Sequence, residues 1–206
     1  MSADHWDQVY GARTDAARSW TEMRPAASLE LLEGPDWGPG TRIVDVGGGA
    51  SRFVDHLLDL EWHVGVLDVS SVALDEARER LGAEAARRVE WIHGSVLDYR
   101  PGERWDVWHD RASFHFLTEP DERERYRAAL AASVVPGGTV ILATFHLDGP
   151  ERCSGLPVRR YDASGLAAAL GGGFVLEESL ETTHVTPAGG HQPFVYGRFR
   201  RVEADR

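Results

Sequence analysis

The sequence contains no lysine and only one cysteine. All 22 basic residues among its 206 residues are arginine. Schiff-base chemistry and a phosphate-loop lysine are therefore excluded. The single cysteine, Cys153, excludes a disulfide framework or a cysteine-based zinc cluster within the chain. The histidines include no H-x-x-x-H pair of the kind that zinc hydrolases carry on one helix, so we expect no metal site.

Positive charge and long apolar runs are also scarce. The formal net charge is -11, which argues against a nucleic-acid partner because clustered cations supply most of that affinity. No apolar run is long enough to cross a bilayer. The first seven residues are polar and acidic, unlike a secretory signal. We therefore expect a cytoplasmic protein, a monomer or homodimer, that binds neither membrane nor nucleic acid.

The most informative stretch is residues 42–51, RIVDVGGGAS. Its apolar β-branched residues predict a buried strand. Asp45 lies near the end of that strand, and Gly47, Gly48 and Gly49 predict a sharp turn into a helix. A glycine turn between a strand and a helix is typical of nucleotide sites in α/β sheets. Arg52 stands where a dinucleotide fingerprint needs its third glycine.

A second acid follows the next predicted strand. Residues 62–67 are mostly apolar and end at Asp68, about 20 residues beyond the glycine turn. At this spacing an acid accepts hydrogen bonds from the ribose hydroxyls of a bound nucleotide. Asp68 is alternatively a cap for the helix that follows. We favour the ribose role because of the spacing and the position after a strand.

These two segments resemble motifs of the class I S-adenosylmethionine (SAM) methyltransferases. The resemblance implies SAM as cofactor, with its amino-acid end at the glycine turn and Asp45 supporting that turn. It also implies ribose contacts from Asp68 and Val69 and adenine contacts from Ser95 and Val96. Ser95 stands where this family usually has an acid, and a hydroxyl accepts a hydrogen bond more weakly than a carboxylate does.

The N-terminal segment is rich in aromatic residues. Trp6, Tyr10 and Trp20 are similar to residues at the start of thiol, halide and tellurite methyltransferases, where this segment folds over the cofactor. The resemblance implies that Trp20 lies near the sulfonium of SAM. Alternatively, these rings only attach an N-terminal helix to the core.

The densest group of reactive side chains follows the strand predicted over residues 105–109. Asp110 and Arg111 come directly after it, and His115 lies within an aromatic segment. The carboxyl ends of neighbouring strands meet at the ligand edge of such a sheet. We expect His115 to act as a base, with Asp110 and Arg111 beside it; Asp110 also belongs to the expected cofactor site. The alternatives are a packed histidine and a structural ion pair.

The order of the predicted elements indicates an α/β three-layer sandwich around a mostly parallel seven-stranded sheet. The terminal strand is expected to be antiparallel, as in class I SAM methyltransferases. We predict a single domain over 1–206, with an N-terminal helical lid (1–34), a SAM-binding core (41–146) and a C-terminal helix and β-hairpin (162–200).

The expected function is SAM-dependent methyl transfer to a sulfur, oxygen, nitrogen or soft-anion nucleophile of a small molecule. A protein methyltransferase, for example one acting on lysine, is the main alternative, and a NAD-dependent oxidoreductase a weaker one. A nucleic-acid methyltransferase is disfavoured because the sequence N/D-P-P-Y is missing after residue 109. The sequence leaves open the acceptor, the need for a base, and the role of Cys153 within the 147–160 loop.

Overall fold

The computed structural model describes residues 2–12, 14, 17–34 and 37–202. Four positions of the predicted lid, residues 1, 13, 15 and 16, therefore lie outside the described residues. The helices are α1 (Ala3–Ala12), α2 (Ala26–Glu30), α3 (Phe53–Leu58), α4 (Ser71–Ala86), α5 (Pro120–Ser133) and α6 (Ala163–Leu170). The long strands are β1 (Arg42–Val46), β2 (His63–Asp68), β3 (Val89–His93), β4 (Trp105–Arg111), β5 (Val134–Phe145), β8 (Phe174–Val185) and β9 (His191–Arg201). Shorter elements are the 3₁₀ turn η2 (Phe114–Phe116) and the small hairpin of β6 (Arg152–Cys153) and β7 (Leu156–Pro157).

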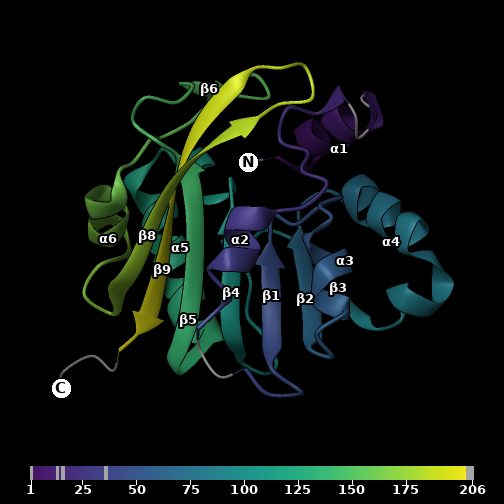
Figure 1. Ribbon diagram of the computed structural model, residues 1–206, viewed down its shortest axis with the longest axis horizontal. Coiled ribbons are helices and arrows are strands. Elements are labelled where there is room, and N and C mark those ends of the chain that lie inside the picture. Colours follow the sequence, from purple (N-terminus) through teal and green to yellow (C-terminus); the bar gives the residue numbers. More distant parts are fainter. Residues whose placement is uncertain (1, 13, 15–16, 35–36, 203–206) are drawn as a thin grey trace.

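The long strands form one seven-stranded sheet in the order β3-β2-β1-β4-β5-β9-β8 (Figure 1). The first five strands of this order are parallel neighbours, whereas β9 runs antiparallel to both β5 and β8. The predicted fold class, with its antiparallel terminal strand, is thereby confirmed. The chain order reverses at β1 and β4, so the ends of these two strands flank the crevice where such sheets bind ligands.

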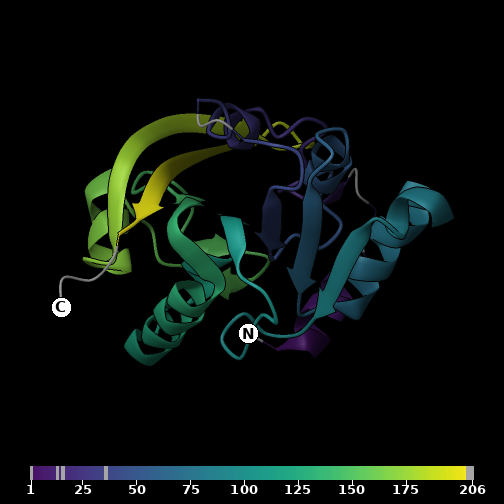
Figure 2. The ribbon, with the colours of Figure 1, turned by 90° about the horizontal axis from the view of Figure 1, so that it is seen from below.

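The central strands are buried on both faces, as their β-branched sequences predict. Along β1, Ile43 joins one hydrophobic cluster and Val44 the other, and along β4 Val107 and Trp108 divide in the same way. Figure 2 shows helices on both sides of the sheet. The two clusters are the two sides of the core, and they leave the carboxyl edge of the parallel strands for polar and glycine residues.

Local signals place several element boundaries. The Ser70 hydroxyl caps α4 by accepting a hydrogen bond from the Ala73 amide at 3.1 Å. Asp162 caps α6 through the Gly165 amide at 2.6 Å. The bounds of β5 include the Pro136-Gly137-Gly138 stretch, because the strand begins at Val134. Trp105 pairs with Val134 and Val107 with Thr139, so the residues between Val134 and Thr139 form an irregularity in the pairing of β4 with β5.

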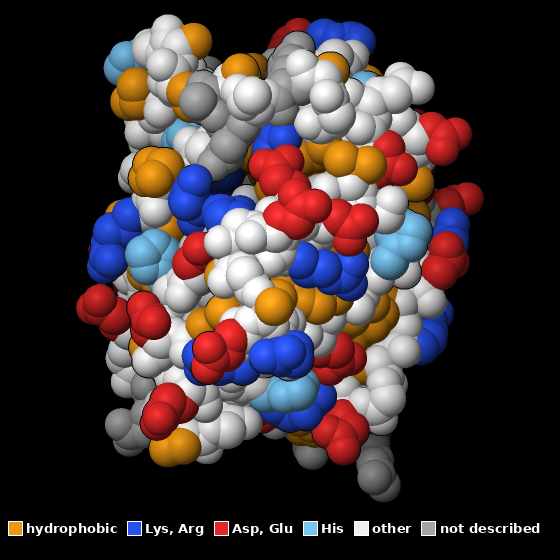
Figure 3. Space-filling view, turned by 90° about the vertical axis from the view of Figure 1, so that its right-hand side faces the viewer, with side chains coloured by type: hydrophobic (Ala, Val, Ile, Leu, Met, Phe, Trp, Pro, Cys, Tyr) orange, Lys and Arg blue, Asp and Glu red, His pale blue; other side chains and the backbone are white. Residues whose placement is uncertain are grey.

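Two surface properties bear on partners. On the face shown in Figure 3, arginine side chains are interspersed with aspartate and glutamate side chains, so that face carries no basic stripe of the kind that tracks a nucleic-acid backbone. Among the helices of the described residues, none is both long and apolar enough to span a membrane.

Candidate functional site

The turn between β1 and α3 leaves no room for side chains. Gly47 and Gly49 have φ of 66° and 47°, which favours glycine. A Cβ at Gly47 would lie 2.7 Å from the Ser113 Cβ, and one at Gly48 would lie 2.5 Å from the Asp45 Oδ2. A Cβ at Gly49 would overlap the Tyr10 hydroxyl. The three residues, called the glycine turn below, thus permit close approach of neighbouring groups to the backbone.

Asp68 ends β2 beside this turn, because the Gly47 amide donates to the Leu67 carbonyl at 2.7 Å. Its carboxylate accepts a hydrogen bond from the Ser70 amide at 2.8 Å and is only 7% exposed. Burial raises the pKa of Asp68 to about 7, and the negative charge of Asp45 adds to this, although backbone N–H groups oppose it. Asp68 is therefore a carboxyl group that titrates near neutral pH at a ligand-facing strand end.

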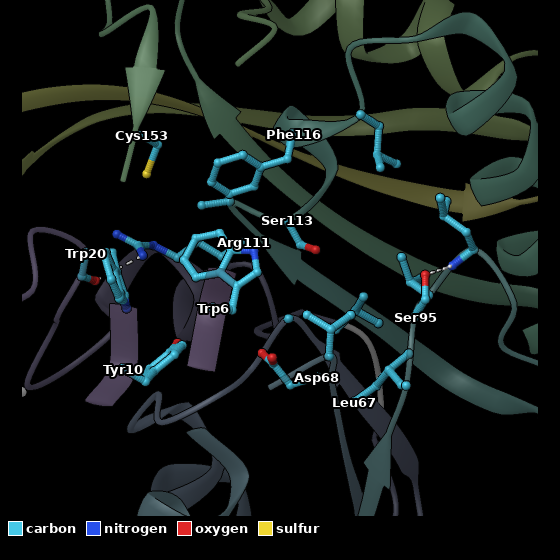
Figure 4. A pocket seen from close by; sticks show the side chains of 18 residues that line it. Trp6, Tyr10, Trp20, Leu67, Asp68, Ser95, Arg111, Ser113, Phe116 and Cys153 are labelled. Atoms are coloured by element: carbon cyan, nitrogen blue, oxygen red, sulfur yellow. Dashed lines mark hydrogen bonds between the residues drawn. The ribbon is translucent and has the colours of Figure 1, made fainter. Parts of the chain in front are cut away.

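A cavity with roughly 800 Å³ of empty space, its open mouth included, lies along the carboxyl ends of β1 to β4. Its floor includes Gly47 and Asp68, and Ser95 and Val96 line it from the segment after β3. On the opposite side it is lined by residues that follow β4 and by Cys153 of β6 (Figure 4).

Four aromatic rings, called the aromatic wall below, close one side of this cavity: Trp6, Tyr10, Trp20 and Phe116. The Trp6 ring centroid lies 5.1 Å from that of Phe116 and 6.0 Å from that of Trp20, and the Tyr10 and Trp20 centroids are 5.8 Å apart. Figure 4 shows the Asp68 carboxylate pointing towards the Trp6 and Tyr10 side of the cavity. The wall unites residues of α1, of the following loop and of η2.

Polar contacts hold α1 in this position. The Ser70 hydroxyl donates to the Asp7 carboxylate at 2.6 Å. Arg18 pairs with Glu76 of α4 through two hydrogen bonds of 2.7 and 2.6 Å, and its guanidinium lies 4.6 Å from the Tyr10 ring centroid. These contacts connect the N-terminal segment to α4, the helix that directly follows Asp68.

Arg111, at the end of β4, holds the segment that carries Trp20. Its guanidinium donates to the Trp20 carbonyl at 3.2 Å, to Glu22 at 2.9 Å and to the Tyr196 hydroxyl at 3.0 Å. Burial alone would raise the pKa of Glu22, but the His184 hydrogen bond and the Arg111 charge hold it below its ordinary value. The Arg111 charge is thus compensated by Glu22 within the protein.

Asp110 does not line the cavity. It is completely buried, and its carboxylate accepts hydrogen bonds from the Ser113 and Phe114 amides at 3.0 and 3.1 Å and from the Tyr126 hydroxyl at 2.8 Å. Burial raises the pKa of Asp110 to about 6. The contacts assign Asp110 the task of holding the turn that presents Ser113 to the cavity.

His115 also lies outside the residues that line the cavity, although the sequence predicts it as a base there. Its side chain is fully buried, with the rings of Phe116 and Phe145 at centroid distances of 4.5 and 4.8 Å. Among the described residues neither ring nitrogen has a hydrogen-bond partner. Burial, aided by the Arg111 charge, lowers the pKa of His115 to about 3. Within the short turn η2, Phe116 faces the cavity and His115 packs behind it.

A second cavity adjoins the first and shares Tyr10, Trp20, Gly47 and Arg111 with it. Asp45 and Gly48 line this second space. Of the site residues that the sequence predicts, those that line the first cavity are Trp20, Gly47, Asp68, Val69, Ser95, Val96 and Arg111. Gly49, Asp110 and His115 line neither cavity.

The lining residues that were not among the predicted site residues include Trp6, Tyr10, Ser113, Phe116 and Cys153. The aromatic composition of the N-terminal segment points to the first two, but residue pattern alone does not distinguish Phe116 from His115. Burial raises the pKa of the Cys153 thiol to about 11, so this thiol is protonated at neutral pH. Among the described residues, no group of three or more His, Cys, Asp or Glu side chains is arranged to hold a metal ion.

Comparison with known proteins finds a similarity to methyltransferases. Residues 44–140 match the family model described as a methyltransferase domain. This match covers the glycine turn, Asp68, Ser95 and the end of β4. No protein with a curated description matches the sequence.

Solved structures share the fold across nearly the whole chain. One is a protein described in connection with the conversion of a disulfide bond into a thioacetal group during echinomycin biosynthesis. Its TM-score is 0.75, and the sequence identity is 23% over 97% of this chain and 93% of that chain. A SAM-dependent methyltransferase from Anabaena variabilis has a TM-score of 0.73 and 16% identity over 97% and 94%. The 1,6-didemethyltoxoflavin-N1-methyltransferase of Burkholderia thailandensis, bound to 1,6-didemethyltoxoflavin and S-adenosylhomocysteine, has a TM-score of 0.67 and 20% identity over 98% and 84%.

Proposed function

We propose that this protein, a SAM-dependent methyltransferase, methylates a small molecule whose reacting atom needs no side-chain base. One observation carries this proposal: the described residues that line the larger cavity include no histidine or glutamate, and the chain has no lysine. The only carboxylate there is Asp68, which we assign to the cofactor. A sulfur nucleophile or another soft anion meets this condition because it reacts without prior removal of a proton by the protein.

The cavity suits the cofactor on physical grounds. Ionised Asp68 accepts hydrogen bonds from the two ribose hydroxyls, while Val69 packs beside the sugar. Ser95 and Val96 receive the adenine, with a hydroxyl acceptor in place of a carboxylate. We assign the amino-acid end to the glycine turn, whose Gly47 lines the cavity; the missing side chains let Ser113, Asp45 and Tyr10 approach the backbone there. When bound, SAM supplies a methyl group on a positively charged sulfur.

The aromatic wall would serve the reaction in two ways. Ring faces attract a cation, so Trp20 and its neighbours stabilise the positive charge near sulfur. The rings and Phe116 also exclude water and leave a largely apolar space for the acceptor. Such a wall holds donor and acceptor close together, and this positioning lowers the barrier of an in-line displacement.

The remaining predicted catalytic residues act by positioning. Arg111 holds the segment of Trp20, and its charge is already balanced by Glu22, so we do not assign it an anionic substrate. Asp110 holds the turn that carries Ser113 and Phe116. Cys153 contributes a protonated, weakly polar thiol to the acceptor side. In this proposal His115 packs behind Phe116 and transfers no proton.

A small acceptor is also supported by the position of α1. Its Trp6 and Tyr10 line one side of the cavity and narrow the space for an acceptor. The similar Burkholderia protein is a methyltransferase of 1,6-didemethyltoxoflavin, which is a small molecule. We therefore place a protein acceptor second.

The test is the pH dependence of methyl transfer to a set of thiols of similar shape and different pKa. With SAM saturating, kcat/KM for the acceptor should rise with the thiolate fraction, so the inflection should move with the pKa of each thiol. Mass spectrometry identifies the methylated atom, and a phenol of matched shape serves as control. An inflection at one constant pH for all acceptors, with the phenol used equally well, would show that a base on the protein takes part.

A further inference from the structure

A chain of three buried polar side chains links three distant segments behind the glycine turn. The His109 Nδ1 lies 2.7 Å from the Asp45 Oδ1, and the His109 Nε2 lies 2.8 Å from the Ser28 hydroxyl. Ser28 is completely buried, and the other two residues are each 3% exposed. They belong to α2, β4 and β1, and all three line the second cavity.

The order of atoms is that of a Ser-His-Asp nucleophile, but the surroundings exclude that role. A nucleophilic serine must reach a substrate carbonyl, whereas the Ser28 hydroxyl is buried against His109 and lies within hydrogen-bonding reach of Tyr196. The Asp45 carboxylate is also engaged on its other side, because its Oδ2 lies against the backbone of Gly48.

Each member of the chain restricts the next. An ionised carboxylate can only accept, so the His109 Nδ1 must donate to Asp45. The His109 ring is also fixed by the Phe53 ring at a centroid distance of 4.2 Å. Asp45 is therefore held in one orientation, with one oxygen on the imidazole and the other at the glycine turn. A buried carboxylate without such partners would be strongly destabilised.

The same chain continues away from the turn. Ser28 hydrogen-bonds with Tyr196, whose hydroxyl accepts from Arg111 at 3.0 Å. Arg111 then binds Glu22 and the Trp20 carbonyl. A continuous set of hydrogen bonds thus joins the glycine turn to the segment that carries one ring of the aromatic wall.

We propose that Ser28 and His109 are positioning residues that orient Asp45 at the glycine turn and thereby couple cofactor binding to the position of the Trp20 segment. This inference rests on the proposed function for the assignment of the glycine turn to SAM. It adds a physical link between the two ends of the site. Ligand groups that bind at the glycine turn stabilise the orientation of Asp45, and the hydrogen-bond chain transmits this stabilisation to α2 and the Trp20 segment.

The mildest test is Ser28→Ala, with Ser133→Ala as the matched control. Ser133 is an equally buried serine whose hydroxyl bonds only within α5, to Ala129 at 2.7 Å. We expect Ser28→Ala to weaken SAM binding about tenfold, the effect of one lost buried hydrogen bond, and Ser133→Ala to leave it unchanged. Calorimetry with SAM measures both. Equal SAM affinities in the two variants would overturn the proposal.

Two His109 variants separate the two hydrogen bonds. The amide of His109→Asn can replace the Nδ1 donor to Asp45, and that of His109→Gln can replace the Nε2 contact with Ser28. His109→Asn should bind SAM more tightly than His109→Gln. Both should lack the downfield imidazole proton resonance that the Asp45 hydrogen bond gives in the wild type and in Ser133→Ala. The opposite order of affinities would contradict the assigned orientation.

Hydrogen exchange followed by mass spectrometry tests the coupling itself. The backbone amides of residues 17–24, the segment that carries Trp20, are the reporters. SAM should slow their exchange in the wild type and in Ser133→Ala, but not in Ser28→Ala at SAM concentrations that saturate it. Protection in all three proteins would refute the coupling. A protein that shows this coupling but fails to methylate any thiol would instead refute the proposed acceptor class.

Discussion

The proposed ribose contact of Asp68 predicts that SAM binding depends on pH in a way that can be calculated. The pKa of this carboxyl is raised to about 7, above its ordinary value, mainly by burial. Ribose hydroxyls donate best to the ionised form, which makes charge-assisted hydrogen bonds. Binding therefore requires loss of a proton below pH 7. The apparent Kd should be nearly constant above pH 8 and weaken about tenfold at pH 6 relative to that plateau.

The test variant is Asp68→Asn, which keeps the shape of the side chain and removes its titratable proton. The variant should bind SAM at least about tenfold more weakly than the wild type at pH 8, because charge-assisted hydrogen bonds are lost. Its affinity should stay flat between pH 6 and pH 8.5. The two curves should therefore approach each other as the pH falls, since the wild-type carboxyl becomes neutral like the amide.

Calorimetry in two buffers with different ionisation enthalpies gives both Kd and the number of protons released. At pH 6 the wild type should release close to one proton per SAM bound, and Asp68→Asn none. Asp98→Asn is the matched control, because Asp98 is an exposed acid that pairs with Arg125 outside both cavities. Parallel pH curves for the wild type and Asp68→Asn would refute the assignment of the ribose contact to Asp68.

Three further predictions concern the glycine turn, the aromatic wall and the buried histidine. Gly49→Ala should weaken SAM binding at least about tenfold, because its Cβ meets the Tyr10 hydroxyl and φ is positive; calorimetry measures this, and an unchanged Kd would show that the turn adapts. Trp20→Leu should raise the Kd for SAM, because the ring face proposed to lie beside the sulfonium stabilises a positive charge that is lost during transfer; Trp20→Phe should retain most of the affinity in the same calorimetric assay. For His115 the folded-state pKa is depressed to about 3, so the stability it contributes is present above pH 6.5 and is lost as the pH falls, by about 2 kcal/mol at pH 5. In urea titrations at pH 7 and pH 5, His115→Phe should show no such loss of stability, and its turnover should be unchanged. A large fall in the turnover of a stably folded variant would show that His115 acts as a base.

The orientation of η2, which places Phe116 and not His115 at the cavity, could not be predicted from the sequence. A polar residue among aromatic residues after β4 is reasonably assigned to the site, since that strand end meets the crevice. Which of two adjacent residues faces the cavity depends on how a three-residue turn is rotated by the hydrogen bonds of Asp110 to its amides. Those contacts direct Phe116 inward and place His115 against Phe145.

The local part of this protein could be derived from its sequence because the responsible forces act between neighbours in the chain. Apolar β-branched runs and a triple-glycine stretch determine strands, a turn and the helices between them, and the spacing of Asp68 places an acid at the next strand end. These features are enough to indicate a nucleotide-binding edge. They do not depend on packing between distant segments.

Only the tertiary structure determines which side chains from distant parts of the chain meet at that edge. Trp6 and Phe116 are far apart in the chain and become neighbours only because α1 is held at α4 by Asp7 and Arg18. Ser28, His109 and Asp45 make a single hydrogen-bonded chain only after the sheet has brought β1 and β4 together. Their partners are chosen by packing and burial across the whole fold, and no local pattern of residues encodes such a choice.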